Sequence, residues 1–223
     1  METEKLKQLA AEQAVEEVES GMIVGLGTGS TIYYALLKLG EKIRGGLDII
    51  GIPTSKQTEE IAIQQGISLS TLGAHPEIDL TIDGADEVNP TLDLIKGAGG
   101  ALVREKIIAH ASKRLVIIID KGKQVEQLGF KFPVPVEVVP FGWQSTQIAL
   151  NQICRGSTLR PDFVSDNGNY ILDCAFDGIP DPVTTEIEIN NLPGVVENGL
   201  FINRTDQLII GAASGVQTLK RQE

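Results

Sequence analysis

The chain has 223 residues, a formal net charge of −11, 42% hydrophobic residues and 22% charged residues. A chain of this length buries about 70% of its unfolded surface, so its core needs neither a disulfide nor a metal. The composition is that of a folded globular protein and excludes long disordered segments. The acidity argues against a general binder of nucleic acid or anionic membranes, but a few lysines could still bind an anionic substrate locally.

Signals for export, membrane insertion and metal binding are weak. The two cysteines, Cys154 and Cys174, lack the close spacing of a structural zinc site and are too few for a disulfide scaffold. The first residues, METEKLKQLA, are acidic and helical in pattern, unlike a signal peptide. The longest apolar run, Leu115–Ile119, is far shorter than the ~20 residues that span a membrane. We therefore expect a soluble cytoplasmic protein, with no nucleic-acid or membrane partner.

Strand and helix patterns alternate along the first 120 residues. Helices are predicted after Thr3, after Gly29, at the capping box of residues 54–57 and at 101–111. Short apolar strands are predicted at 22–26, 48–52, 67–72, 78–82 and 115–119. This alternation predicts an α/β fold, a mostly parallel sheet with helices on both faces. The continuous apolar strands indicate that both faces of the sheet are buried.

The pattern changes after Gly129. It predicts a Pro-bounded strand at 132–140, a helix at 144–154, a hairpin at Asn167-Gly168, a helix near 184–189 and a final strand pair near Val195 and Phe201. The segment from Gln207 onward again resembles the first part. We therefore expect an α/β domain formed by 1–129 and 204–223, interrupted by a smaller α+β domain at 130–203.

Four loops follow predicted strands of the first domain, where an open parallel sheet binds its ligands. The first, Gly25–Thr31, is glycine-rich and opens a helix, which suits a phosphate or hydroxyl group. It lacks the full dinucleotide fingerprint and the Lys of a P-loop, so a turn without a ligand is the alternative.

The second loop, Asp83–Glu87, brings three carboxylates together. A shared ligand or lysine, a Mg²⁺ ion or a solvated acidic turn would each explain it.

The third loop places Lys96 before a glycine-rich turn at a helix start, where an ammonium group and backbone N–H groups can stabilise an oxyanion. Glu105 follows in the first turns of that helix, although a surface carboxylate there is common. The fourth loop carries Lys121 and Lys123, which suit a phosphate. No histidine lies in these loops. Together they predict acid–base chemistry on a small phosphorylated molecule without a redox cofactor.

These loops resemble the ribose-5-phosphate isomerase family, type A. The resemblance rests on GLGTGST at 25–31, DGADEV at 83–88, KGAGGALVREK at 96–106 and DKGK at 120–123. It continues through FPVPVEVVP at 132–140, SDNGNYILD at 165–173 and LPGVVENGLF at 192–201, in order and over nearly the whole chain.

The resemblance implies a Rossmann-like domain with an inserted, oligomerising α+β domain, and a homodimer or dimer of dimers. It implies interconversion of D-ribose 5-phosphate and D-ribulose 5-phosphate through a cis-enediolate, in the pentose phosphate pathway, with no cofactor and no metal. Glu105 would be the base, Asp83 the acid–base group for ring opening with Asp86 beside it, and Lys96 the group that steadies the enediolate. Residues implied in substrate binding are Thr28, Gly29, Ser30, Thr31, Gly84, Ala85, Gly97, Ala98, Gly99 and Lys123.

Two positions depart from the family pattern. Ala98 stands where the family usually has glycine, and its methyl group could crowd the backbone near the sugar. Lys121-Gly122 replaces a small residue and Ser, which could strengthen phosphate binding or leave Lys121 in solvent.

Other functions stay open on the residues alone. A non-catalytic sugar-phosphate sensor would need the phosphate loops but not Glu105, Asp83 and Lys96 together. A CoA transferase or an amino-sugar-phosphate deaminase on a similar fold is the other alternative. The deaminase would be expected to use a histidine for ring opening, and neither His75 nor His110 lies in a motif loop.

Overall fold

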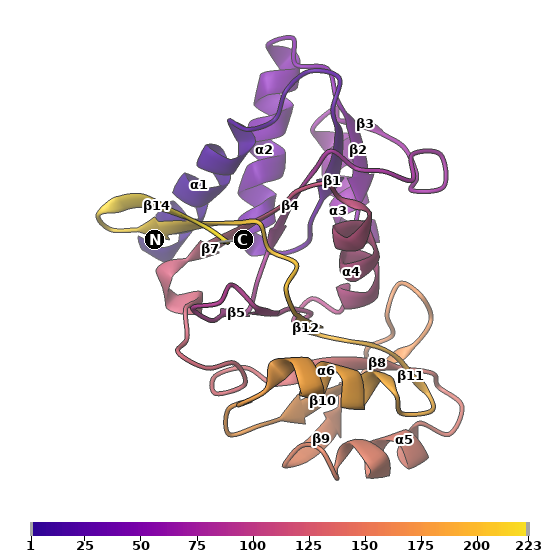
Figure 1. Ribbon diagram of the computed structural model, residues 1–223. Coiled ribbons are helices and arrows are strands. Elements are labelled where there is room, and N and C mark those ends of the chain that lie inside the picture. Colours follow the sequence, from indigo (N-terminus) through magenta and orange to yellow (C-terminus); the bar gives the residue numbers. More distant parts are fainter. Residues whose placement is uncertain (1, 222–223) are drawn as a thin grey trace. The chain divides into compact units, whose positions relative to one another are not determined.

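The computed structural model describes residues 2–221 and divides into two units (Figure 1). Unit 1 comprises Met1–Gly84, Arg104–Lys123 and Arg204–Glu223, and unit 2 comprises Ala85–Val103 and Gln124–Asn203. Residues 85–103 and 124–129, which the sequence pattern grouped with the first domain, thus make most of their contacts within unit 2. No helix described between residues 2 and 221 is long and apolar enough to cross a membrane.

Unit 1 is built on a seven-stranded sheet in the order β14-β13-β7-β4-β1-β2-β3. Its strands are β1 (Ile23–Leu26), β2 (Ile50–Pro53), β3 (Ser68–Leu69), β4 (Leu80–Gly84), β7 (Leu115–Asp120), β13 (Gln207–Ala212) and β14 (Gly215–Lys220). Every pairing is parallel except the one between β13 and β14. The predicted α/β class is therefore confirmed, and the C-terminal segment completes the sheet beside β7.

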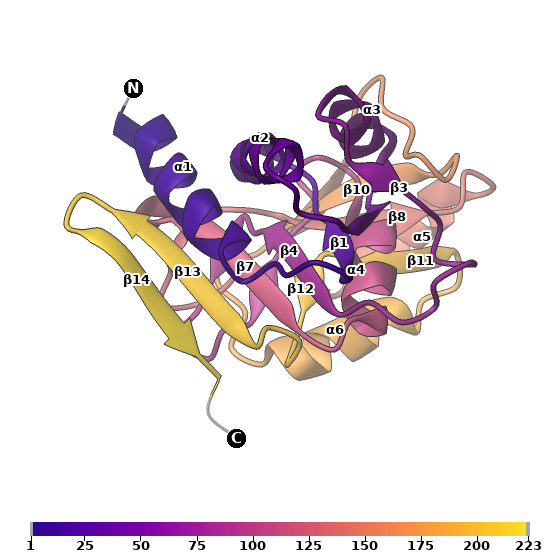
Figure 2. The same cartoon turned by 90° about the horizontal axis from the view of Figure 1, so that it is seen from above.

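Helices cover both faces of this sheet (Figure 2). They are α1 (Glu2–Val15), α2 (Ser30–Arg44), α3 (Lys56–Gln64) and α4 (Leu102–Ala111). The first two bury small and branched apolar side chains against Val24, Ile82 and Val116. Helix α4 packs on the opposite face, where Ile108 meets Ile52 and Ile78.

Glycine allows α4 to approach the sheet closely. A Cβ atom at Gly25 would lie 1.9 Å from the Thr81 hydroxyl oxygen and 2.8 Å from the Cγ2 atom of Ile108. No side chain fits in that space, so the helix can rest directly on β1 and β4. Glu105 is three residues before Ile108 and therefore lies on nearly the same side of α4.

Unit 2 contains two antiparallel sheets, β11-β8-β10-β9 and β12-β6-β5. Their strands are β5 (Glu87–Val88), β6 (Leu94–Ile95), β8 (Val134–Val138), β9 (Gly156–Leu159), β10 (Tyr170–Ala175), β11 (Val195–Asn198) and β12 (Leu200–Phe201). Helices α5 (Trp143–Leu150) and α6 (Pro182–Asn190) complete the unit. One core joins Leu150 and Ile189 from these helices to Val136 of β8.

Two local expectations are confirmed only in part, since the expected strands form but their connection or pairing differs. The hairpin expected at Asn167-Gly168 is longer, because β9 ends at Leu159 and β10 begins at Tyr170. Asn167 instead lies in a turn in which the Gly168 N–H donates to the Ser165 carbonyl, 2.9 Å away. The strands near Val195 and Phe201 do not pair with each other, because β11 joins β8 and β12 joins β6.

Glu87 is a fully buried carboxylate that organises one loop of unit 2. Its oxygens accept the backbone N–H groups of Gly129, Lys131 and Phe132, each at 2.7 Å. This third carboxylate of the Asp83–Glu87 cluster is therefore used inside the protein, as the anchor of the loop that precedes β8.

We expect Glu87→Ala to lower the free energy of unfolding by about 3 kcal/mol or more, because three N–H donors lose their buried acceptor. Urea unfolding followed by circular dichroism would measure the loss. Glu126→Ala is the matched control, since Glu126 is exposed in the same loop region and should change stability by less than about 0.5 kcal/mol. A loss below about 1 kcal/mol in Glu87→Ala would contradict the anchoring role.

Candidate active site

The candidate residues of unit 1 lie where its parallel strands end. The Gly25–Thr31 segment leaves β1, Asp83 is near the end of β4, and Lys121–Lys123 forms a 3₁₀ turn directly after β7. Since the carboxyl ends of parallel strands share one edge of a sheet, these segments gather there. Glu105, in the first turn of α4, is 4% exposed.

Asp83 connects the ends of β1 and β4. Its Oδ1 atom accepts the N–H groups of Thr28, at 3.1 Å, and Gly84, at 2.7 Å. A Cβ atom at Gly27 would lie 2.2 Å from the same oxygen, so only glycine fits beside this carboxylate. The side chain of Asp83 is almost completely buried, and its orientation is set by the loop that it holds.

Thr28 also contacts α3 and its cap through a cluster of hydroxyl groups. Its hydroxyl oxygen lies 2.7 Å from that of Thr54, 2.8 Å from that of Ser55 and 3.1 Å from that of Thr58. The Thr58 hydroxyl donates in turn to the Gly27 carbonyl, at 2.8 Å. The side chain of Thr28 therefore holds the loop against α3. No local sequence pattern indicates this cluster. The capping box predicted at 54–57 would make Thr54 the cap, but the N-cap of α3 is Ser55, whose side chain accepts the Thr58 N–H.

The remaining residues of this loop face outward at the start of α2. Gly29 is the N-cap, with a φ of 125° that only glycine adopts readily, and no side chain caps the helix there. Ser30 and Gly29 are exposed, and Thr31 is partly exposed. The N–H groups and positive dipole end of this 15-residue helix form a suitable environment for a phosphate or hydroxyl oxygen.

The candidate residues of unit 2 centre on Lys96 and the glycine turn, by which we mean residues 97–100. Lys96 follows β6 and is 3% exposed. Its N–H donates to the Gly199 carbonyl at 2.9 Å, and its ammonium group lies 5.4 Å from the centre of the Phe201 ring. Pairing of β6 with β12 thus gives this lysine a fixed backbone and an aromatic neighbour.

The glycine turn is closed by a hydrogen bond from the Gly100 N–H to the Gly97 carbonyl, at 2.9 Å. Asp86 accepts the N–H of Ala98 through Oδ2, at 2.9 Å. Ala98 and Gly99 are exposed. Among residues 2–221 the non-glycine residues with positive φ are Leu92, Asp162 and Asn203, so the alanine at 98 imposes no backbone strain. Gly84 and Ala85 join Asp83 to Asp86 and are partly exposed.

The two histidines and the two cysteines lie outside these loops. His110 is exposed and His75 is partly exposed. Cys154 and Cys174 are buried free thiols in the core of unit 2, where a hydrogen bond from Cys174 lowers the pKa of Cys154 to about 7. Within residues 2–221, no group of three or more His, Cys, Asp or Glu side chains is placed to hold a metal ion.

Comparisons with known proteins agree with one another. Residues 50–215 match the family model described as ribose 5-phosphate isomerase A (phosphoriboisomerase A). The chain is 51% identical to the ribose-5-phosphate isomerase A of Gloeobacter violaceus, with 98% of this chain and 97% of the relative aligned. It is 48% identical to that of Bacillus mycoides, with 95% and 98% aligned.

Solved structures give the same result. A D-ribose-5-phosphate isomerase in complex with phospho-erythronic acid superposes with a TM-score of 0.96 and 42% identity, covering 99% of this chain and all of that chain. The ribose 5-phosphate isomerase A of Methanocaldococcus jannaschii superposes with a TM-score of 0.94 and 42% identity, covering 98% and 99%.

We expect Thr28→Val to lower the free energy of unfolding by about 1–3 kcal/mol, since the substitution leaves buried hydroxyl groups short of a partner. Urea unfolding would measure the change. Ser30→Ala is the control in the same loop, because Ser30 is exposed and its removal should change stability by less than about 0.5 kcal/mol. Equal stabilities for the two variants would mean that the hydroxyl cluster does not hold the loop.

Proposed function

The chain belongs to the ribose-5-phosphate isomerase A family, aldose–ketose isomerases that interconvert D-ribose 5-phosphate and D-ribulose 5-phosphate, and we propose the residues that carry this reaction here. The reaction moves one proton between neighbouring carbons and changes no net redox state. It therefore needs a base, a group that stabilises negative charge on oxygen, an acid–base group for ring opening and a phosphate site.

Glu105 is the base in this proposal. Its carboxylate takes the proton from C2 of the open-chain aldose, the C2–H electrons form the C1–C2 double bond, and the C1 carbonyl becomes an enediolate oxygen. The proton then returns to C1, the O2 hydroxyl proton passes to O1, and the C2 carbonyl forms to give the ketose. The side chain is 4% exposed at the start of α4, which supports a base that the fold holds in one position.

Lys96 stabilises the enediolate. Its buried ammonium group, together with the Gly99 N–H of the glycine turn, offsets the charge that develops on oxygen in the transition state. Asp86 holds the turn through the Ala98 N–H, so its carboxylate belongs to the same environment. Asp83 opens the sugar ring, and the two N–H donors on its Oδ1 atom fix its position.

The observation that carries the proposal is the burial of three ionisable side chains. Asp83 is 1% exposed, Lys96 is 3% exposed and Glu105 is 4% exposed. Removing such groups from water is costly, and folded chains retain them mainly where they are paired or functional. A non-catalytic sugar-phosphate sensor would require the phosphate loops but would have no need for all three.

The phosphate is bound by Lys123 and by the start of α2. Lys123 is partly exposed in the turn after β7, while Gly29, Ser30 and Thr31 present the N-terminus of a long helix at the same edge of the sheet. A cation and a helix N-terminus together suit a dianion. Lys121 is exposed in the same turn and is the alternative ligand.

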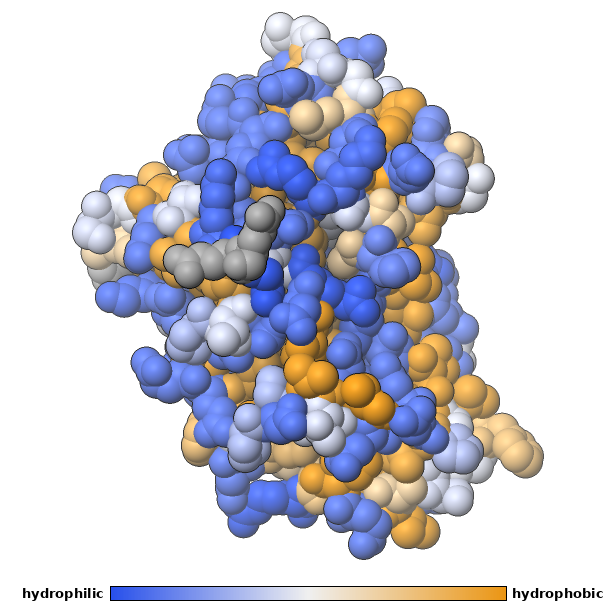
Figure 3. All heavy atoms as spheres, in the orientation of Figure 1, coloured by the Kyte–Doolittle hydropathy of each residue, from blue (hydrophilic) through white to orange (hydrophobic). Residues whose placement is uncertain are grey.

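The enzyme acts as a homodimer or dimer of dimers in the cytoplasm, with unit 2 providing the interface. Large hydrophobic side chains are exposed on unit 2, among them Phe141 at 92%, Ile148 at 68% and Ile187 at 55%. Hydrophobic surface is visible in this part of the molecule in Figure 3. Exposed apolar side chains in such numbers support burial against a second copy.

We expect Glu105→Gln to lower kcat by about 10²–10⁴-fold, because the amide keeps the shape of the side chain but cannot accept the proton. The KM for ribose 5-phosphate should change little. In D₂O, NMR should show deuterium entering C1 of ribulose 5-phosphate with the parent enzyme and almost none with the variant.

Glu59→Gln is the control for this experiment, since Glu59 is an exposed carboxylate in the first turn of α3. Its activity should equal that of the parent. Unchanged turnover and exchange in Glu105→Gln would transfer the role of base to Asp83 or Asp86. The same assay with EDTA tests the Mg²⁺ alternative, which restoration of lost activity by Mg²⁺ would support.

We expect Lys123→Ala to raise the KM for ribose 5-phosphate more than it lowers kcat, because a phosphate contact made equally in ground and transition states acts on binding. Inorganic phosphate should compete with substrate in the parent and less well in the variant. Lys121→Ala, in the same turn, is the matched comparison. A larger rise in KM for Lys121→Ala would move the phosphate site to that residue.

A further inference from the structure

Arg160 joins the glycine turn to the main sheet of unit 2. It follows β9, and its Nε and Nη2 atoms donate to the two carboxylate oxygens of Asp173 on β10, at 3.0 and 2.6 Å. Its Nη1 atom donates to the carbonyls of Gly97, at 3.3 Å, and Ala98, at 3.0 Å. Both charged side chains are mostly buried, at 16% and 24% exposure. One planar guanidinium thus bridges a strand and the turn after Lys96.

These bonds determine which way the peptides of the turn face. In a trans peptide the carbonyl oxygen and the following N–H point in opposite directions. The peptide between Gly97 and Ala98 directs its oxygen to Arg160 and its N–H to Asp86, so it is held from both sides. In the next peptide the Ala98 oxygen also points to Arg160, which directs the Gly99 N–H away from the guanidinium.

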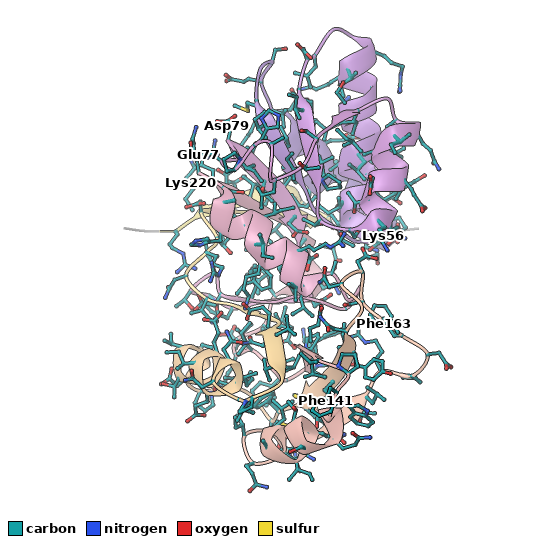
Figure 4. All side chains as sticks on the ribbon, turned by 90° about the vertical axis from the view of Figure 1, so that its right-hand side faces the viewer. Lys56, Glu77, Asp79, Phe141, Phe163 and Lys220 are labelled. Carbon is teal, nitrogen blue, oxygen red and sulfur yellow. The ribbon has the colours of Figure 1, made fainter. Side chains whose placement is uncertain are left out.

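The loop 160–169 adds a second contact with the turn. Phe163 lies beside Arg160, with its ring centre 5.3 Å from the guanidinium carbon. A Cβ atom at Gly100 would be 2.1 Å from Phe163, so the ring rests directly on the turn. Figure 4 labels Phe163, whose ring extends from this loop.

A buried carboxylate holds the far end of that loop. Glu137 on β8 is fully buried, and its Oε1 atom accepts hydrogen bonds from Ser165, at 2.8 Å, Asn167, at 3.1 Å, and Asn169, at 2.8 Å. The loop is therefore fixed at its end as well as at Arg160. An anchored loop holds the ring and the guanidinium in place more rigidly than a mobile one could.

We propose that Arg160 is a positioning residue for the isomerase reaction, which with Asp173 and Phe163 orients the Gly99 N–H of the glycine turn toward the enediolate oxygen. The inference rests on the proposed function of that turn. Arg160 does not need to touch the substrate, because its donors are used on Asp173 and on the carbonyls of Gly97 and Ala98.

The chain offers a matched control in the ion pair of Arg155 and Asp177. This pair also joins the start of β9 to the end of β10, but both side chains are about two-thirds exposed, at 65% and 67%. Arg155→Ala removes the same kind of side chain from the same two-stranded region. Loss of an exposed pair should cost little stability, and the glycine turn should be unaffected.

The first measurement is steady-state kinetics. Arg160→Ala should lower kcat by about 10–10²-fold, as expected when donors shift by about an ångström, and change the KM for ribose 5-phosphate by less than about threefold. Millimolar methylguanidinium should restore part of the lost kcat in Arg160→Ala and have no effect on the parent or on Arg155→Ala. Arg160→Lys keeps the charge but lacks the planar fork of donors, so its kcat should also be lowered. This variant replaces Arg160→Ala in the test if the alanine variant folds poorly.

The second measurement is independent of activity. Hydrogen–deuterium exchange by mass spectrometry should show faster exchange in peptides covering 97–101 in Arg160→Ala, with no change in Arg155→Ala. Unchanged exchange there, or unchanged kcat with faster exchange, would overturn the proposal. A parent enzyme without isomerase activity would instead overturn the proposed function, while the exchange data would still support or overturn the contact between Arg160 and the turn.

Discussion

The close approach of β1 and β4 at their carboxyl ends is the constraint on which the first unit depends. Gly27 lies so near Asp83 that any side chain there would overlap the carboxylate. The same carboxylate accepts the Thr28 N–H, which directs the following residues into α2. Asp83, a buried charge near the N-terminus of α2, and Gly27 therefore depend on each other. A substitution at either position would displace the other residue.

Buried carboxylates have a different purpose in the second unit. Glu87 holds the loop before β8 through backbone N–H groups, and Glu137 holds the loop before β10 through side-chain donors. Asp173 orients an arginine. In each case a carboxylate fixes irregular backbone that has no strand ladder to satisfy it. Residues without a chemical role thereby determine where Lys96 and the glycine turn can lie.

These anchors explain why several residues were recognised from the sequence and others were not. Glycines, lysines and carboxylates in short motifs at strand ends can be read from a single segment of sequence. Asp83, Lys96 and Glu105 could therefore be proposed from the sequence alone. Arg160 and Phe163 lie about 60 residues beyond the turn they contact. Local pattern carries no information about such a pair, and an arginine beside a hairpin is most simply a solvated residue.

The sequence by itself determined the α/β class, the buried strands of the main sheet, the approximate start of α3 and the four loops, because periodicity, glycine and capping are local properties of the chain. Only the tertiary structure decided that β5 and β6 join β12, a strand of two residues more than 100 positions away. It also decided that Glu87 is an anchor and that Thr28 faces a hydroxyl cluster. Partners in these contacts are chosen by packing over long sequence separations, and no short segment records them.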